Sequence, residues 1–110
     1  RAVATREVFE ETGIPVLAEQ LTALNSAPFF PSTGTSDEAM YFYYCELVLP
    51  KPRILALDNQ QQGVASEHER ITTHVLPFVE GHRLITNTNG ILLNFLYLKA
   101  VEDWLTLRQL

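Results

Sequence analysis

The stretch Arg6-Glu7-Val8-Phe9-Glu10-Glu11-Thr12-Gly13-Ile14 carries most of the information in this sequence of 110 residues. The segment from Ala2 to Thr12 has the pattern of a helix, because Val8, Phe9 and Thr12 fall on one side at helical spacing, together with Thr5. Gly13 is a suitable residue just past a helix end, and Pro15 prevents continuation. We therefore predict a helix over residues 2–12.

Three carboxylates share one face of this predicted helix. At about 100° per residue, Glu7, Glu10 and Glu11 lie on the same side, opposite the apolar set. Glu7 and Glu11 repel each other at i, i+4, and the last helical turn is the unfavourable end for anions. Carboxylates that converge in this way can hold a hard divalent cation such as Mg²⁺ through oxygen ligands. The alternative interpretation is a solvated acidic face, which is common on helices.

The same nine residues resemble the second half of the Nudix box, Gly-x5-Glu-x7-Arg-Glu-U-x-Glu-Glu-x-Gly-U, where U is a bulky aliphatic residue. Every fixed position from the arginine onward is matched. The resemblance implies that Glu7, Glu10 and Glu11 bind Mg²⁺, with Mn²⁺ as an alternative, and that Glu11 is essential for catalysis. It makes Arg6 a residue that pairs with a box glutamate and orients it. The leading glycine and first glutamate of the box would precede Arg1, so we expect the N-terminal strands of the domain to be missing.

Two downstream segments resemble the ADP-ribose and nucleotide-sugar pyrophosphatases of this family. Residues 31–38 are similar to their Ser-Pro-Gly-x-Ser-(Asp)-Glu turn, although Thr33 stands where those enzymes usually carry proline. Residues 67–71 are similar to a loop with Glu-x-Glu, which implies that Glu67 is the general base and Glu69 a further metal ligand. The alternative for residues 31–38 is an ordinary turn between two strands. The alternative for residues 67–71 is an exposed acidic loop.

The rest of the chain predicts short strands interleaved with helices, an α+β fold or a mixed sheet with helices packed on it. The resemblance implies an α/β/α sandwich around a mixed sheet, as one partial domain over residues 1–110. We expect burial of Phe29, Phe30 and Cys45, and packing of Trp104 on the sheet or in a dimer contact. The expected elements are extended segments at 16–23 and 27–30, a largely buried strand at 40–49 ended by Pro50 and Pro52, a polar loop at 58–69, a strand at 71–76, a helix at 77–85, and a helix capped by Thr88 or Asn89 that runs to about Arg108.

Composition excludes several classes of protein. Eight Lys and Arg against thirteen Asp and Glu give a net charge of −5, so the sequence lacks the excess of basic residues that is typical of nucleic-acid-binding proteins. A single cysteine excludes an internal disulfide framework and is compatible with a reducing compartment such as the cytoplasm. No stretch of the sequence has the roughly 20 apolar residues that span a bilayer.

Taken together, the resemblance implies a metal-dependent hydrolase of a nucleoside diphosphate linked to another group. ADP-ribose or another nucleotide sugar is the expected substrate, and a nucleoside monophosphate and a sugar phosphate are the products. It further implies a homodimer. Two alternatives stay open. One is the same fold acting on dinucleotide polyphosphates, coenzyme A or oxidised nucleotides, and the other is a non-catalytic Nudix-like module that binds a nucleotide or a protein.

Overall fold

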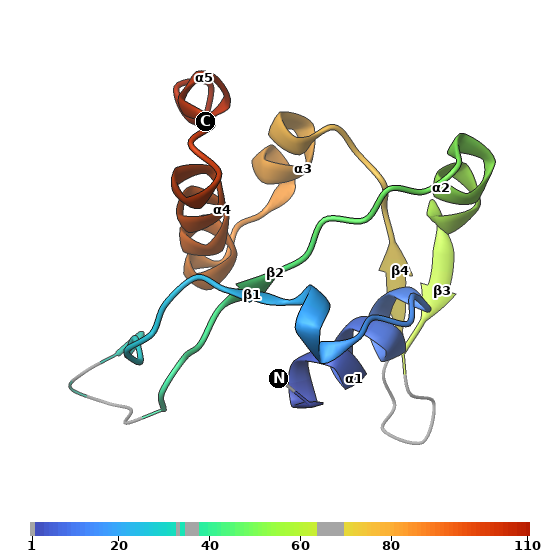
Figure 1. Cartoon of the computed structure of the whole chain (residues 1–110). Helices are drawn as coiled ribbons and strands as arrows, with labels where there is room; N and C mark the ends of the chain where they lie inside the picture. The colour runs from blue at the N-terminus through green and yellow to red at the C-terminus, as the bar shows by residue number, and fades with distance from the viewer. Residues whose placement is uncertain (1, 33, 35–37, 64–69) are drawn as a thin grey trace. The chain divides into compact units, whose positions relative to one another are not determined.

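Helices and short antiparallel strands follow one another along the chain (Figure 1), so the fold is α+β, as predicted. The computed structural model describes residues 2–32, 34, 38–63 and 70–110. It divides into two units, each built from two separate chain segments. Unit 1 combines Arg1–Leu21 with Cys45–Leu76, and unit 2 combines Thr22–Tyr44 with Pro77–Leu110. The expectation of one domain over residues 1–110 stays a prediction.

Unit 1 is formed by helices around one small hairpin. Its elements are α1 (Ala2–Thr12), the 3-10 helix η1 (Ala18–Gln20), α2 (Lys51–Leu57), β3 (Gln60–Gln62) and β4 (Ile71–Thr73). β3 and β4 pair antiparallel, with Gln61 opposite Thr72. α1 has the bounds that the sequence predicted, and β4 confirms the first half of the strand expected at 71–76.

Three predictions for unit 1 were wrong in detail. The segment expected to be extended at 16–23 contains η1, where the backbone N–H of Leu17 donates to Oε1 of Gln20 at 2.7 Å. Pro50 and Pro52 were expected to end a strand, but Pro50 is the N-cap of α2 and Pro52 lies in its first turn. A helix tolerates proline in its first turn. The predicted polar loop at 58–69 contains β3, whose three glutamines give no alternating apolar signal.

Unit 2 pairs a two-stranded sheet with the C-terminal helices. Its elements are β1 (Thr22–Ala23), β2 (Tyr43–Tyr44), α3 (Phe78–Leu84), α4 (Thr88–Ala100) and α5 (Trp104–Leu107). β1 and β2 are antiparallel, with Thr22 opposite Tyr44. The expected mixed sheet is therefore not found among the described residues, whose strands form two separate antiparallel pairs. The strand expected over 40–49 is reduced to β2 and an isolated bridge between Phe29 and Met40.

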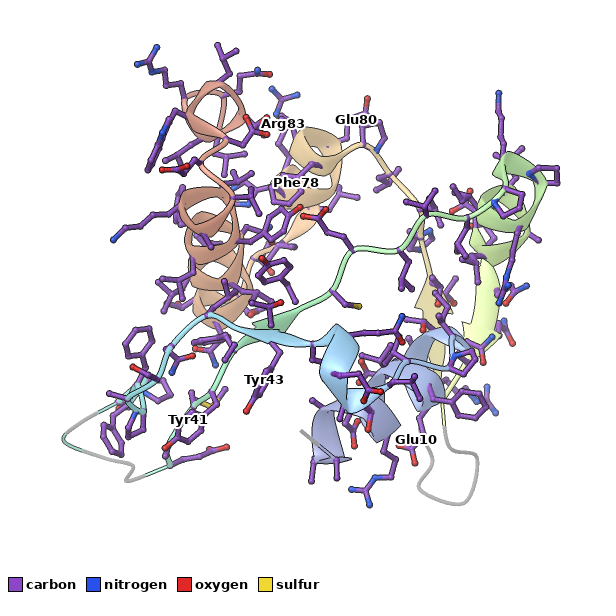
Figure 2. All side chains as sticks on the ribbon, viewed as in Figure 1. Glu10, Tyr41, Tyr43, Phe78, Glu80 and Arg83 are labelled. Atoms are coloured by element: carbon purple, nitrogen blue, oxygen red, sulfur yellow. The ribbon has the colours of Figure 1, made fainter. Side chains whose placement is uncertain are left out.

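The core of unit 2 is small and aromatic. Leu98 and Phe42 are its buried apolar side chains, at 2% and 7% exposure. The ring of Tyr97 meets that of Tyr44 edge-on at 5.0 Å and stacks with that of Phe78 at 5.7 Å; Figure 2 labels Phe78 on α3.

The predicted burial of several side chains is wrong. Phe29 and Phe30 are 38% and 46% exposed. Trp104 is 47% exposed in the single chain, and its packing on the sheet or in a dimer contact stays a prediction. Within 40–49 only Phe42 is buried, and Cys45 is half-buried rather than enclosed. The single strand expected there does not form, so most of its side chains have no sheet face to cover them.

The C-terminal helix is capped one residue earlier than predicted, and it is broken. Oδ1 of Asn87 accepts from the backbone N–H of Gly90 at 2.7 Å, so Asn87 is the N-cap of α4. α4 ends at Ala100, Glu102 has a φ of 57°, and Asp103 caps a separate α5. Among the described residues, no helix is both long and apolar enough to cross a membrane.

Candidate functional site

The last turn of α1 carries Glu10 and Glu11, and its end is closed by a glycine. The backbone N–H of Gly13 donates to the carbonyl of Phe9 at 2.8 Å, and Gly13 has a φ of 74°. This is the left-handed helix end that glycine adopts without steric cost. The hydroxyl of Thr12 donates to the carbonyl of Val8 at 2.6 Å. The local sequence therefore ends the helix directly after the acidic pair.

Two further carbonyls of this turn are satisfied by the β3–β4 hairpin. The backbone N–H of Gly63, just after β3, donates to the carbonyl of Glu10 at 2.9 Å. The hydroxyl of Thr73 on β4 donates to the carbonyl of Glu11 at 3.1 Å. A helix end otherwise leaves such carbonyls without an intrahelical partner. The hairpin thus fixes the backbone of the two acidic residues, and Figure 1 shows α1 passing beside β3 and β4.

The approach between helix and hairpin is close at Gly13. A Cβ atom added there would lie 3.1 Å from Nε2 of Gln62 on β3. Both the positive φ and this contact therefore favour glycine at the position that the sequence motif specifies.

The three carboxylates of α1 differ in their exposure. Glu7 and Glu10 are half-buried, Glu11 is exposed, and Arg6 is exposed next to Glu7. The side chain of Glu10 projects from the helix in Figure 2. These groups have the chemistry of a Mg²⁺ site, because carboxylate oxygens are the ligands that this ion takes from proteins.

The spacing of these carboxylates is not that of a complete metal site. Within the part of the chain that the structure describes, no three His, Cys, Asp or Glu side chains are close enough together to hold a metal ion. A cation bound on α1 would therefore need ligands in addition to Glu7, Glu10 and Glu11, or a change in their rotamers. Glu67 and Glu69, predicted as base and ligand, lie outside the described residues.

The chain connection that carries Glu67 and Glu69 leaves from residues held at α1. Gly63, which precedes it, is bonded to Glu10, and Ile71, which follows Arg70, is paired with Gln62. Sequence reasoning missed β3, and so it missed the anchor of this connection. Gly63 was the one signal in the sequence that could have indicated this anchor, since an isolated glycine next to a strand often marks a place where another backbone segment approaches closely.

Two polar side chains of unit 2, His82 and Asp103, are held by neighbouring residues. Nδ1 of His82 lies 2.9 Å from Nδ2 of Asn94, and its ring is 5.7 Å from that of Phe95. The hydroxyl and then the backbone N–H of Thr106 donate to Asp103, at 2.7 and 3.1 Å, and lower the pKa of that carboxyl from its ordinary value of 3.8. Both sets of contacts belong to unit 2, away in the chain from the Arg6–Ile14 motif.

Comparison with known proteins adds no relative: no family model, no curated protein and no solved structure matches this chain. The case for a function therefore rests on the residues of this chain and on how the structure holds them.

Proposed function

We propose that this chain is a Nudix-type pyrophosphatase that hydrolyses a nucleoside diphosphate linked to a second group, with ADP-ribose or another nucleotide sugar as substrate. One observation carries the proposal. The intact motif from Arg6 to Ile14 stands on a regular helix whose acidic last turn is bonded to the β3–β4 hairpin. That hairpin is the one whose connection contains Glu67 and Glu69.

In the proposed mechanism, the residues of the chain have separate tasks. Glu7, Glu10, Glu11 and Glu69 would hold Mg²⁺, or Mn²⁺ in its place. An ion held there would supply polarisation of the diphosphate and would neutralise its charge. Glu67 accepts a proton from the attacking water. The oxygen of that water bonds to phosphorus while the phosphoanhydride P–O bond breaks. Arg6 is a positioning residue that orients a box glutamate. The products are a nucleoside monophosphate and a sugar phosphate.

Three finer parts belong to the same proposal. The chain would belong to a Nudix domain with an α/β/α sandwich and would act as a homodimer; both follow from the resemblance. A cytoplasmic location agrees with the single cysteine. The net charge of −5 does not oppose a polyanionic substrate, because bound cations invert the local potential.

A second function is favoured by one observation, the absence of a three-ligand group among the described carboxylates. A Nudix-like module that binds a nucleotide or a protein without hydrolysis needs no complete metal site. The intact set of Glu7, Glu10 and Glu11 favours the enzyme, since a binding module has no need to keep three mutually repelling carboxylates on one helix face.

Hydrolysis assays separate the two functions. The chain is incubated with Mg²⁺ and ADP-ribose, UDP-glucose, GDP-mannose or diadenosine polyphosphate, and a circular-dichroism melt is recorded on the same sample. An enzyme should lose at least about a hundredfold in kcat in Glu11→Gln, because a charge at the reacting centre is removed. Glu19→Gln is the matched control, since Glu19 is an exposed glutamate of unit 1 outside the motif.

The outcomes differ clearly. Hydrolysis that Glu11→Gln abolishes and Glu19→Gln leaves unchanged supports the enzyme and identifies the substrate class. A cooperatively melting sample that hydrolyses nothing, yet binds ADP-ribose equally well with and without Glu11→Gln in calorimetry, contradicts it in favour of the binding module. Preference for diadenosine polyphosphate would keep the fold proposal and change the substrate.

A further inference from the structure

Unit 2 contains a half-open cavity whose lining is mostly aromatic and apolar. Its volume is about 420 Å³, inside the roughly 300–1,000 Å³ range of small-molecule sites. The apolar lining consists of Phe29, Phe30, Pro31, Met40, Phe42 and Leu92. The polar lining consists of Asn87, Thr88 and Asn89, at the start of α4. No lining residue carries a charge, so the cavity suits a neutral ligand.

The backbone behind the aromatic lining is held firmly. Phe29 and Met40 face each other across the isolated bridge and exchange two backbone hydrogen bonds, of 3.0 and 2.7 Å. The side chain of Asn25, only 9% exposed, donates to the carbonyl of Met40 at 3.0 Å and accepts from the N–H of Phe42 at 2.8 Å. These bonds place the lining before any ligand arrives, which lowers the ordering cost of binding.

The aromatic side chains of the lining are left partly uncovered. The rings of Phe29 and Phe42 lie 6.2 Å apart at 52°, while Phe29 and Phe30 remain 38% and 46% exposed. A planar ring placed against such side chains buries their exposed area and gains stacking that any π face can supply. The side chains of Thr88 and Asn89 offer donors and acceptors to polar atoms on the edge of that ring, and Asn87 adds its Nδ2 donor, since its Oδ1 caps α4.

We infer that this cavity binds a neutral planar heteroaromatic ring, and that the ligand class is the base of a nucleoside. The ring stacks on Phe29 and Phe30, and its polar edge is met by residues 87–89. The inference rests on the lining of unit 2 alone and does not depend on the proposed hydrolysis. An aromatic side chain of a peptide is the competing occupant. Unlike the edge of a base, a phenyl or indole ring presents few polar atoms to the solvent-accessible side chains of residues 87–89, so it would gain stacking without their hydrogen bonds.

A single methionine makes the test direct. Met40 is the one methionine of the sequence and lines the cavity, so the methyl signal of ¹³C-methyl-methionine-labelled protein needs no assignment. Titration with adenosine should give a saturable chemical-shift change, with a Kd of about 1 mM or tighter, a modest demand of roughly 4 kcal/mol. Ribose, which has the sugar without the base, should give no saturable shift.

Matched variants then separate stacking from general effects. Phe30→Leu keeps an apolar side chain but removes the ring, and should weaken adenosine binding about fivefold or more. Phe95→Leu is the control, because Phe95 is 39% exposed in the same unit and is not among the lining residues. It should leave the Kd unchanged.

Three results would overturn the inference. The first is a wild-type titration with adenosine that shows no saturable shift of the Met40 methyl. The second is an equal effect of Phe30→Leu and Phe95→Leu. The third is tighter binding of N-acetyl-tryptophanamide than of adenosine, which would assign the cavity to a peptide side chain. The comparison of adenosine with ribose uses unaltered protein, so it decides the matter even where a variant fails to fold.

Discussion

The acidic turn that ends α1 (residues 10–13) and the segments of unit 2 around Asn25, which carry Phe29, Met40 and Phe42 and are called the aromatic arm below, are stabilised in opposite ways. The acidic turn is accessible, has no buried residue, and is held by hydrogen bonds that Gly63 and Thr73 donate to its carbonyls. The aromatic arm is centred on Phe42, which is 7% exposed, and on the carboxamide of Asn25, which is 9% exposed. Backbone contacts fix the first region, and a buried polar side chain together with aromatic packing fixes the second.

This difference predicts how much stability each region loses when a residue that holds it in place is replaced. In the acidic turn, the bonds from Gly63 and Thr73 end on backbone carbonyls, so these bonds do not use the carboxylates as acceptors. A ring-binding cavity needs apolar walls in fixed positions, so its anchor must be buried and fully satisfied. Loss of an anchor should therefore cost more in the aromatic arm than in the acidic turn.

The largest effect is expected from Asn25→Leu. This change removes the partner of the Phe42 N–H, whereas the Met40 carbonyl keeps the bond from the Phe29 N–H. Leaving a buried N–H unsatisfied costs about 1–3 kcal/mol. Urea unfolding followed by the fluorescence of Trp104, the single tryptophan and a residue of unit 2, measures the loss. The exposed neighbour Ser26→Ala should stay within about 0.5 kcal/mol of the wild type. Equal midpoints for the two variants would refute the role assigned to Asn25.

A smaller effect is expected from Gly13→Ala in the acidic turn. An alanine held at a φ of 74° costs about 1–2 kcal/mol, while the crowding by Gln62 adds little because the end of that side chain can move. Gly13→Asn should cost less, because asparagine tolerates the left-handed region. Urea unfolding followed by circular dichroism compares the pair. A Gly13→Ala variant as stable as wild type would contradict the helix end described here.

Thr73→Val should have a local effect. The variant loses the hydroxyl bond to the carbonyl of Glu11, worth about 0.5–1 kcal/mol, but valine suits a strand. We expect faster hydrogen exchange at the amides of Gly13 and Gly63, which close the same helix end. Thr72→Val is the matched control, since Thr72 is the exposed neighbour on β4 whose side chain points to the other face. If both variants exchange alike, the hairpin does not anchor the acidic turn.

The smallest effect concerns pH and Asp103. Hydrogen bonds from the hydroxyl and the N–H of Thr106 lower the pKa of this carboxyl below 3.8 in the folded protein. The carboxylate therefore contributes stability above its unfolded pKa, and the contribution is lost as pH falls through the lowered folded pKa. Asp103→Asn should reduce the Tm slightly near neutral pH, and the difference from wild type should shrink below about pH 3.8. A difference that grows on acidification would contradict this sign.

Sequence reasoning succeeded where local chemistry decides the structure. α1 has its predicted bounds because Gly13 and Pro15 end it from within the sequence. α3 was predicted at 77–85 and found at Phe78–Leu84. Reasoning failed where a pairing partner decides. β3 consists of three glutamines and is a strand only because Ile71–Thr73 lies opposite, and the expected long strand at 40–49 shrinks because few partners face it.

The candidate site divides along the same line. Local sequence accounts for the helix, for the common face of Glu7, Glu10 and Glu11, and for the glycine that ends the turn, because these follow from helical spacing and backbone conformation. Long-range packing, by contrast, is what bonds the hairpin to the carbonyls of Glu10 and Glu11. It also brings Phe29, Phe30 and Met40 together with residues 87–89 around a cavity. Such contacts join residues up to 62 positions apart in the chain, and no local propensity encodes which distant partner satisfies an exposed carbonyl or an uncovered ring.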